Sequence, residues 1–195
     1  PPSPAATLEF GSPNACNLCH HDKEAIMGNY AGHKKEDAQW AAKYVKEWFG
    51  EKSGAPVLEL GRMIQWCRQG EWDKLPEILA YLESPNCDSA SAVAILRLLI
   101  DCPNPEKWPA VRGQLDNKHE WVRATAAAGL QYDHDPETTK GLIKAAADRF
   151  RTVRIRAAGS LLGRDLSSYS AEEQQAYEKA HAEYWNSLVI FPDRW

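Results

Sequence analysis

Hydrophobic positions recur along most of the chain at the three- and four-residue spacing that is typical of amphipathic helices. The first clear case spans residues 37–49, where apolar positions 41, 44, 45, 48 and 49 fall on one helical face. Asp37 is suited to cap the start of this helix and Gly50 to end it. Because the rest of the chain keeps the same periodicity, we predict an all-α protein.

One helical segment recurs in similar form. Four copies begin at residues 59, 90, 121 and 152, a constant spacing of 31, and the last two share Val122-Arg123 and Val153-Arg154. Shorter amphipathic segments precede the last three copies, over residues 72–82, 108–115 and 139–150. Helix pairs with a fixed period of about 30–45 residues are typical of α-solenoids. The pattern therefore predicts about four helix pairs that stack as a solenoid.

The two ends of the chain differ from this pattern. The proline-rich first residues are expected to form a flexible leader. Residues 171–188 predict a charged helix, for which Ser170 and Glu173 would form a capping box. This helix is expected to close the open end of the solenoid, and its aromatic anchors would be Tyr177, Tyr184 and Trp185.

Composition narrows the class of protein. The 195 residues are 44% hydrophobic and 26% charged, which is ordinary for a globular domain, and the net charge of −4 argues against nucleic acid as a partner. No apolar run approaches the roughly 20 residues that span a bilayer. The chain begins with Pro1 rather than Met, so we expect a periplasmic or otherwise extracytoplasmic mature chain whose signal peptide has been removed, or an excised segment.

The clearest chemical motif is C-x-x-C-H, formed by Cys16, Cys19 and His20. In a secreted protein this spacing predicts one covalently bound haem c. The two thiols reach the two vinyl groups of one porphyrin, and the next imidazole supplies the proximal iron ligand. A zinc or iron–sulfur site and a redox disulfide are the alternatives, although the second ligand cluster or βαβ context that they require is missing from the sequence.

Two resemblances follow from these residues. Residues 55–165, with their Val-Arg pairs and small-residue helices, resemble HEAT repeats. Residues 13–165 are similar to multihaem c-type cytochromes in which a haem-binding segment precedes HEAT repeats, although only one C-x-x-C-H occurs here and residues 24–36 look like an insertion. The resemblance implies a haem-binding segment over residues 1–52 and a HEAT-like repeat domain with a C-terminal capping helix over residues 53–195.

An electron-transfer haem usually has a second axial ligand, His or Met. His33, in a glycine-flanked loop, is the preferred distal ligand, and Met27 in the same loop is the alternative. Two further possibilities remain: a distal ligand from another polypeptide, or an iron without a distal ligand. Less favoured are His21, Met63, His119, His134 and His181. The apolar wall of the haem pocket is expected from the aromatic residues Trp40, Tyr44 and Trp48, which could equally pack the helix onto the first repeat.

The other three cysteines are expected to be buried free thiols. Cys87 and Cys102 bracket one predicted helix of about 20 Å, too long for a disulfide between them. Cys67 and Cys102 fall near the same end of neighbouring helices and are the pair that a disulfide would join.

These patterns favour a c-type cytochrome whose repeats dock it to a redox protein or a multi-subunit respiratory complex. An assembly subunit with a largely structural haem is the alternative. A haem enzyme or gas sensor would require an open distal site. Catalytic triads, phosphate loops and nucleotide fingerprints are missing from the sequence, so we do not expect an enzyme.

Overall fold

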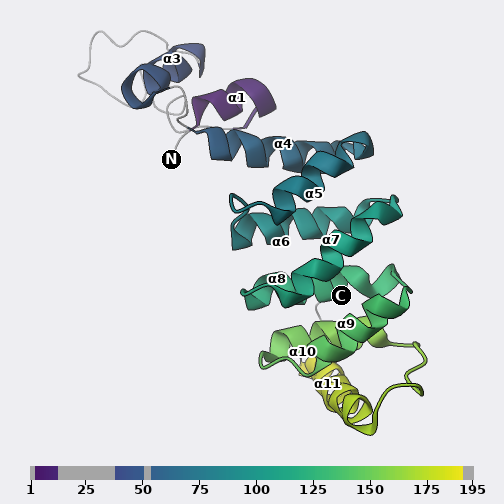
Figure 1. Ribbon diagram of the computed structural model, residues 1–195. Helices are drawn as coiled ribbons and strands as arrows, with labels where there is room; N and C mark the ends of the chain where they lie inside the picture. The colour runs from purple at the N-terminus through teal and green to yellow at the C-terminus, as the bar shows by residue number, and fades with distance from the viewer. Residues whose placement is uncertain (1–2, 13–37, 51–53, 191–195) are drawn as a thin grey trace. The chain divides into compact units, whose positions relative to one another are not determined.

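The computed structural model describes residues 3–12, 38–50 and 54–190, and its regular elements within these ranges are all helical (Figure 1). The all-α prediction is confirmed for these residues. Ten α-helices occur in them: α1 (Pro4–Phe10), α3 (Ala38–Phe49), α4 (Ala55–Gln69), α5 (Leu75–Glu83), α6 (Ser89–Leu98), α7 (Trp108–Gly113), α8 (Glu120–Gly129), α9 (Pro136–Ala146), α10 (Arg151–Leu161) and α11 (Ala171–Ile190). The chain forms two compact units, Pro1–Gln65 and Trp66–Trp195. The functional division of the sequence at residue 52 stays a prediction.

The first unit contains α1 packed against α3. α1 corrects the expectation of a flexible leader. Its start is capped by Ser3, whose Oγ accepts the Ala6 N–H at 3.3 Å, and Pro4 occupies the first turn, where a missing N–H costs nothing. α3 ends as predicted at Gly50, which has φ +84° and donates its N–H to the Lys46 carbonyl at 2.8 Å. Asp37 lies outside the described residues.

Contacts with the first part of α4 hold α1 in the same unit. The Phe10 ring lies against Gly61, where an added Cβ would come within 2.4 Å of Cε2. Glu9 and Arg62 form an ion pair with two hydrogen bonds. The short N-terminal helix is therefore stabilised by tertiary contacts that no local pattern reveals.

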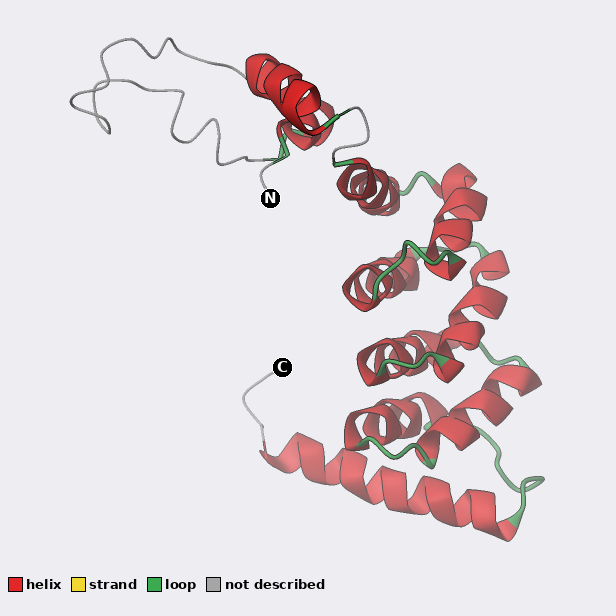
Figure 2. Cartoon of the chain, turned by 60° about the vertical axis from the view of Figure 1, so that its left-hand side comes forward, coloured by secondary structure: helices red, strands yellow, loops and turns green. Residues whose placement is uncertain are grey.

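In the second unit, α6, α8 and α10 lie in one row, and α5, α7 and α9 lie in a second row beside it (Figures 1 and 2). α11 runs across the end of these rows and packs against α9 and α10. The first-row helices begin at Ser89, Glu120 and Arg151, one residue before the predicted segment starts.

The second-row helices depart from their predicted bounds. Only part of residues 108–115 is α-helical, because α7 ends at Gly113 and continues as a 3-10 turn. α9 is shifted to Pro136–Ala146, since the Asp135 carboxylate accepts the Glu137 N–H at 2.8 Å and caps an earlier start. Residues 148–150, predicted to be helical, turn the chain instead, with Asp148 accepting the Phe150 N–H at 2.8 Å.

Small residues allow the first row to pack closely. Ala126 and Ala127 on α8 and Ala157 and Ala158 on α10 are all 0% exposed. Ser160 on α10 donates its hydroxyl to the Ala127 carbonyl on α8 at 2.7 Å. Side chains larger than alanine at these positions would push the two helices apart.

Two arginines make the same backbone contacts 31 residues apart. Arg123 donates to the carbonyls of Asn117 and Lys118 at 2.7 and 3.2 Å, and Arg154 donates to those of Asp148 and Arg149 at 2.9 and 3.1 Å. Each arginine also binds a carboxylate farther along the chain. Arg123 pairs with Asp148 at 2.7 Å, and Arg154 pairs with Glu183 at 2.7 Å. The Val-Arg pairs of the sequence therefore hold the turns that precede α8 and α10.

These ion pairs change the acidity of their partners. Burial opposes ionisation of Asp148, but hydrogen bonds from Arg123 and the Phe150 N–H outweigh it, so the pKa of Asp148 lies below its ordinary value. Hydrogen bonds from Arg154 likewise lower the pKa of Glu183. Both carboxylates are therefore ionised at neutral pH and stabilise the fold as anions.

The C-terminal helix begins as predicted. Ser170 donates its N–H to the Glu173 carboxylate at 2.9 Å, and Glu173 donates its N–H to Ser170 Oγ at 3.3 Å, which completes the capping box. Tyr184 packs against Gly159, where an added Cβ would lie 3.1 Å from Cε2. Trp185 is not the predicted anchor, because it is 52% exposed and its indole points along the helix to His181.

The three described cysteines are free thiols. Cys67 and Cys102 are buried, as expected, but Cys87 is half-buried because it follows the turn before α6. Burial raises the pKa of Cys67 and of Cys87 to about 11. Cys102 adds to the effect on Cys67, so these two thiols lie near each other.

Candidate functional site

The predicted haem ligands fall in the part of the chain that the structure does not describe. Cys16, Cys19 and His20 lie outside the described residues, as do His33 and Met27. The helices that bracket this segment in sequence, α1 and α3, belong to one compact unit and pack against each other. α3 is the described helix that follows this segment and carries the residues predicted to wall the haem pocket.

α3 carries a continuous ladder of aromatic rings at four-residue spacing. The ring centroids of Trp40 and Tyr44 are 4.8 Å apart with planes tilted by 53°, and those of Tyr44 and Trp48 are 5.3 Å apart with a tilt of 47°. Trp40 and Tyr44 are half-buried, whereas Trp48 is 66% exposed. Phe49 beside it is 72% exposed. The rings of Trp48 and Phe49, at the end of α3, are therefore largely uncovered by other described residues. That these aromatic residues of α3 form the wall of a haem pocket stays a prediction.

The less favoured candidates for the distal iron ligand that the structure describes lie in different surroundings. Met63 is 6% exposed in α4 and belongs to the core. His119 and His134 are exposed, and His181 accepts the Trp185 indole N–H on Nε2 at 2.8 Å. Within the described ranges, no three His, Cys, Asp or Glu side chains form a group that could hold a metal ion.

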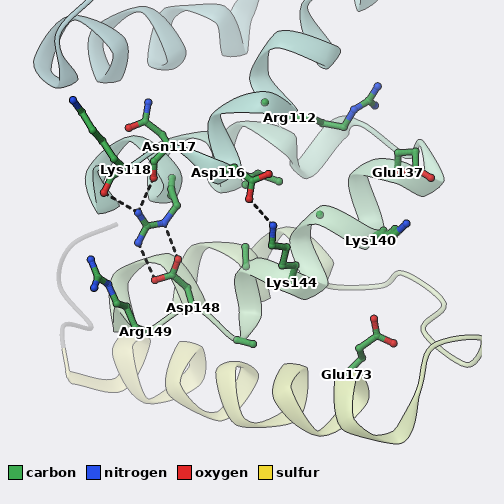
Figure 3. Close-up of a pocket in the computed structure, with 16 residues that line it drawn as sticks. Arg112, Asp116, Asn117, Lys118, Glu137, Lys140, Lys144, Asp148, Arg149 and Glu173 are labelled. Atoms are coloured by element: carbon green, nitrogen blue, oxygen red, sulfur yellow. Dashed lines mark hydrogen bonds and ion pairs between the residues drawn. The ribbon is translucent and has the colours of Figure 1, made fainter.

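An open groove of about 1240 Å³ lies in the second unit, between α7, α9 and the start of α11 (Figure 3). Three of its six cations form ion pairs with carboxylates, among them Arg112 with Asp133 at 3.0 Å. Lys144 binds Asp116 at 2.6 Å, and Arg123 binds Asp148 at 2.7 Å. The sequence reasoning missed this groove, and its only local signal is the pair Lys140 and Lys144 at helical spacing.

Chemistry in this groove is limited by its side chains. Lys118, Lys140 and Arg149 line it without an ion pair to a described carboxylate, and Glu137 and Glu173 are further acidic residues of its lining. Its lining residues include no His, Cys, Ser, Thr or Tyr, so they offer neither a hydroxyl or thiol nucleophile nor an imidazole base. The ionisable groups of the groove are therefore lysine amines, arginine guanidinium groups and carboxylates.

A second hollow of about 630 Å³ lies on the first row, where α10 meets α11. α10 contributes Ile155, Arg156 and Gly159, and α11 contributes Tyr184 and Leu188. α8 and the end of the α6 segment complete it with Ala128, Gln131 and Ile100. Compared with the first groove, this one is richer in aliphatic and aromatic side chains and is not lined by any carboxylate.

No match to a family model, a curated protein or a solved structure was found for this chain. Among the described helices, none combines the length and the apolar character needed to cross a membrane.

Proposed function

We propose that the protein is an extracytoplasmic c-type cytochrome that transfers electrons through one covalently attached haem and docks to a redox partner or respiratory complex through its helical repeats. The observation that carries the proposal is the C-x-x-C-H motif of Cys16, Cys19 and His20. Two thiols and an imidazole in this order are the donor set that haem c requires, so the residues present fit the group.

The three motif residues have separate roles in this proposal. Cys16 and Cys19 attach the porphyrin through two thioether bonds and prevent its loss. His20 supplies one imidazole nitrogen to the iron. The haem, when bound, accepts and releases one electron. His33 is proposed as the distal ligand and Met27 as its alternative, and the chosen ligand sets the reduction potential, which is higher for Met than for His.

The aromatic ladder on α3 supports the proposal from the described residues. Trp40, Tyr44 and Trp48 present rings on one helix face, and Trp48 leaves apolar area uncovered by other described residues. Such rings would exclude water from one edge of a porphyrin, which lowers the local dielectric and so influences the potential.

We further propose that the second unit is a HEAT-like solenoid. The support is the recurrence of helix starts at Ser89, Glu120 and Arg151 and of the backbone contacts of Arg123 and Arg154. A solenoid offers an extended surface and has no chemistry of its own, which suits a docking role.

The decisive experiment is expression in a host that matures c-type cytochromes, followed by intact-mass analysis and a pyridine haemochrome spectrum of the purified chain. We expect the added mass of one haem and a thioether-type spectrum. Cys16→Ala with Cys19→Ala should abolish both, whereas the matched control Cys87→Ala should retain them. A wild-type chain of unmodified mass from that host would overturn the proposal.

Axial ligation is tested by near-infrared magnetic circular dichroism of the oxidised protein. We expect a bis-histidine signature that is lost in His33→Ala and kept in Met27→Leu. A methionine–iron signature lost in Met27→Leu would instead assign Met27. Carbon monoxide binding to the reduced wild-type protein would indicate an open site and favour the gas-binding alternative.

A further inference from the structure

The outward face of the first row in the second unit is formed by the same positions on three successive helices. On α6, α8 and α10, one set of positions is buried, and a separate set on another side of each helix is half-buried or exposed. We call this set the first-row face. It comprises Ala90, Val93, Ala94 and Arg97 on α6, Trp121, Thr125 and Ala128 on α8, and Thr152, Ile155, Arg156 and Gly159 on α10.

This face combines apolar surface with a hollow. Trp121 is 63% exposed, although tryptophan is usually mostly covered in a folded domain. The hollow of about 630 Å³ beside Ile155 is closed on one side by α11. Ala128, a small residue, lines this hollow, so a bound side chain could approach α8 closely.

The charges on this face are unbalanced. Arg112, Arg123 and Arg154 elsewhere in the unit each pair with a carboxylate at 3.0 Å or less. Arg97 and Arg156 are exposed and have no ion pair with any carboxylate among the residues that the structure describes. The positions that make up the face contain no Asp or Glu.

Acidic side chains of the described residues form no ion pair with these two arginines. Glu183 on α11 is committed to Arg154, and Asp101 lies beyond the end of α6 without an ion pair to Arg97. A chain with a net charge of −4 thus displays an apolar surface whose only charged side chains are positive. Charge complementarity therefore selects an acidic occupant.

We propose that the first-row face binds an acidic segment of a partner protein, with an apolar side chain of that segment in the hollow and its carboxylates on Arg97 and Arg156. Packed helices lie about 8–10 Å apart, so α6 and α10 are separated by about 16–20 Å and a helix of about 12 residues spans both arginines. The inference deepens the docking role proposed above but does not depend on the haem.

The test is selection of random peptides of about 12 residues, displayed on phage, against the immobilised full-length chain. We expect enriched peptides to combine Asp or Glu with Leu, Phe or Trp. The synthetic peptide from the most enriched clone is then titrated by fluorescence anisotropy. Its affinity should fall at least about tenfold in Arg97→Glu/Arg156→Glu and in Trp121→Ala, and should weaken with added salt.

Matched variants distinguish this surface from general charge. Arg97→Lys/Arg156→Lys should retain most of the affinity, and Lys118→Glu/Lys140→Glu, which changes the net charge equally in the other groove, should leave it within about twofold. Unchanged helical circular dichroism shows that each variant is folded. Enrichment of basic or uncharged peptides, equal loss in the two charge-reversal variants, or no enrichment at all overturns the inference.

The same titration separates this inference from the proposed function. The haem-free variant Cys16→Ala/Cys19→Ala should bind the peptide as the wild type does. If the chain carries haem but does not bind the peptide, only the docking inference is overturned. If the wild-type chain binds the peptide but carries no haem, only the cytochrome proposal is overturned.

Discussion

Arg123 offers the sharpest test of how the second unit is held together. Its guanidinium binds Asp148 with two hydrogen bonds of 2.7 and 3.1 Å, while the side chains of Arg123 and Asp148 are 11% and 13% exposed. Arg123→Met keeps much of the side-chain volume but removes the charge and five donors. It leaves the Asp148 carboxylate and the Asn117 carbonyl without this partner.

The expected loss follows from the burial of the pair. Exposed ion pairs contribute up to about 1 kcal/mol, and breaking a fully buried pair costs about 3–5 kcal/mol. With nearly nine-tenths of both side chains covered, we expect Arg123→Met to lower the free energy of unfolding by about 3 kcal/mol. For a chain of 195 residues, this corresponds to a melting temperature lower by about 6–12 °C.

The assay is urea unfolding followed by circular dichroism at 222 nm, a wavelength chosen for helix. Arg156→Met is the matched control, because Arg156 is exposed on α10, and it should change stability by less than about 0.5 kcal/mol. A loss below about 1 kcal/mol for Arg123→Met, or an equal loss in both variants, would refute the assignment of Arg123 as a buried tether between α8 and the turn before α10.

The pH dependence provides an independent readout of the same pair. The folded pKa of Asp148 lies below its ordinary value of 3.8, so its stabilisation is present above pH 3.8 and is lost as the pH falls through the folded pKa. Arg123→Met should therefore cost most near pH 6 and progressively less below about pH 4. A cost that is the same at both pH values would contradict the role of the charged pair.

Three further predictions address the thiols and the helix packing. In denaturant, a thiol reagent should titrate three thiols per chain if Cys16 and Cys19 carry haem, and five in unmodified chains; four or five in holoprotein would contradict attachment at both sites. In the native protein at about pH 8, Cys67 and Cys87 should be alkylated at least about tenfold more slowly than a small thiol. The reason is that the pKa of each thiol is raised to about 11, and the rates are measured by peptide mass mapping. Ala127→Leu should destabilise the chain by about 2–3 kcal/mol, because the position is 0% exposed between α8 and α10, whereas Ala90→Leu on the open face should cost less than about 0.5 kcal/mol; equal thermal stabilities of the two variants would refute close packing at Ala127.

Local signals in the sequence predicted most of the helical elements. The 3.6-residue periodicity located the starts of α6, α8, α10 and α11 to within one residue, and the end of α3 at Phe49. Gly50 and the pair Ser170 and Glu173 were recognised because a helix end depends on neighbours within four residues. α9 begins three residues before the predicted start at residue 139, because the Asp135 carboxylate caps an earlier first turn.

The sequence predicted less of the candidate site than of the helices, and the structure describes only part of that site. The motif Cys16, Cys19 and His20 is read from spacing alone, and its geometry lies outside the described residues. The ladder formed by Trp40, Tyr44 and Trp48 follows from helical spacing, and the structure adds the ring distances and the exposure of Trp48. The sequence did not reveal the first-row face, because alanine and arginine residues also occur at buried positions of the same helices.

The sequence by itself determined that the described part of the chain is helical, where several of its helices begin, and that one C-x-x-C-H motif is present. Only the tertiary structure decided which arginines are paired: Arg123 meets Asp148 25 residues away, whereas Arg156 meets no described carboxylate. It also decided that Trp185 is exposed and that residues 4–10 form a helix. The physical reason is range: periodicity and capping act within one or two turns, whereas burial and charge pairing depend on segments that meet only after the helices pack.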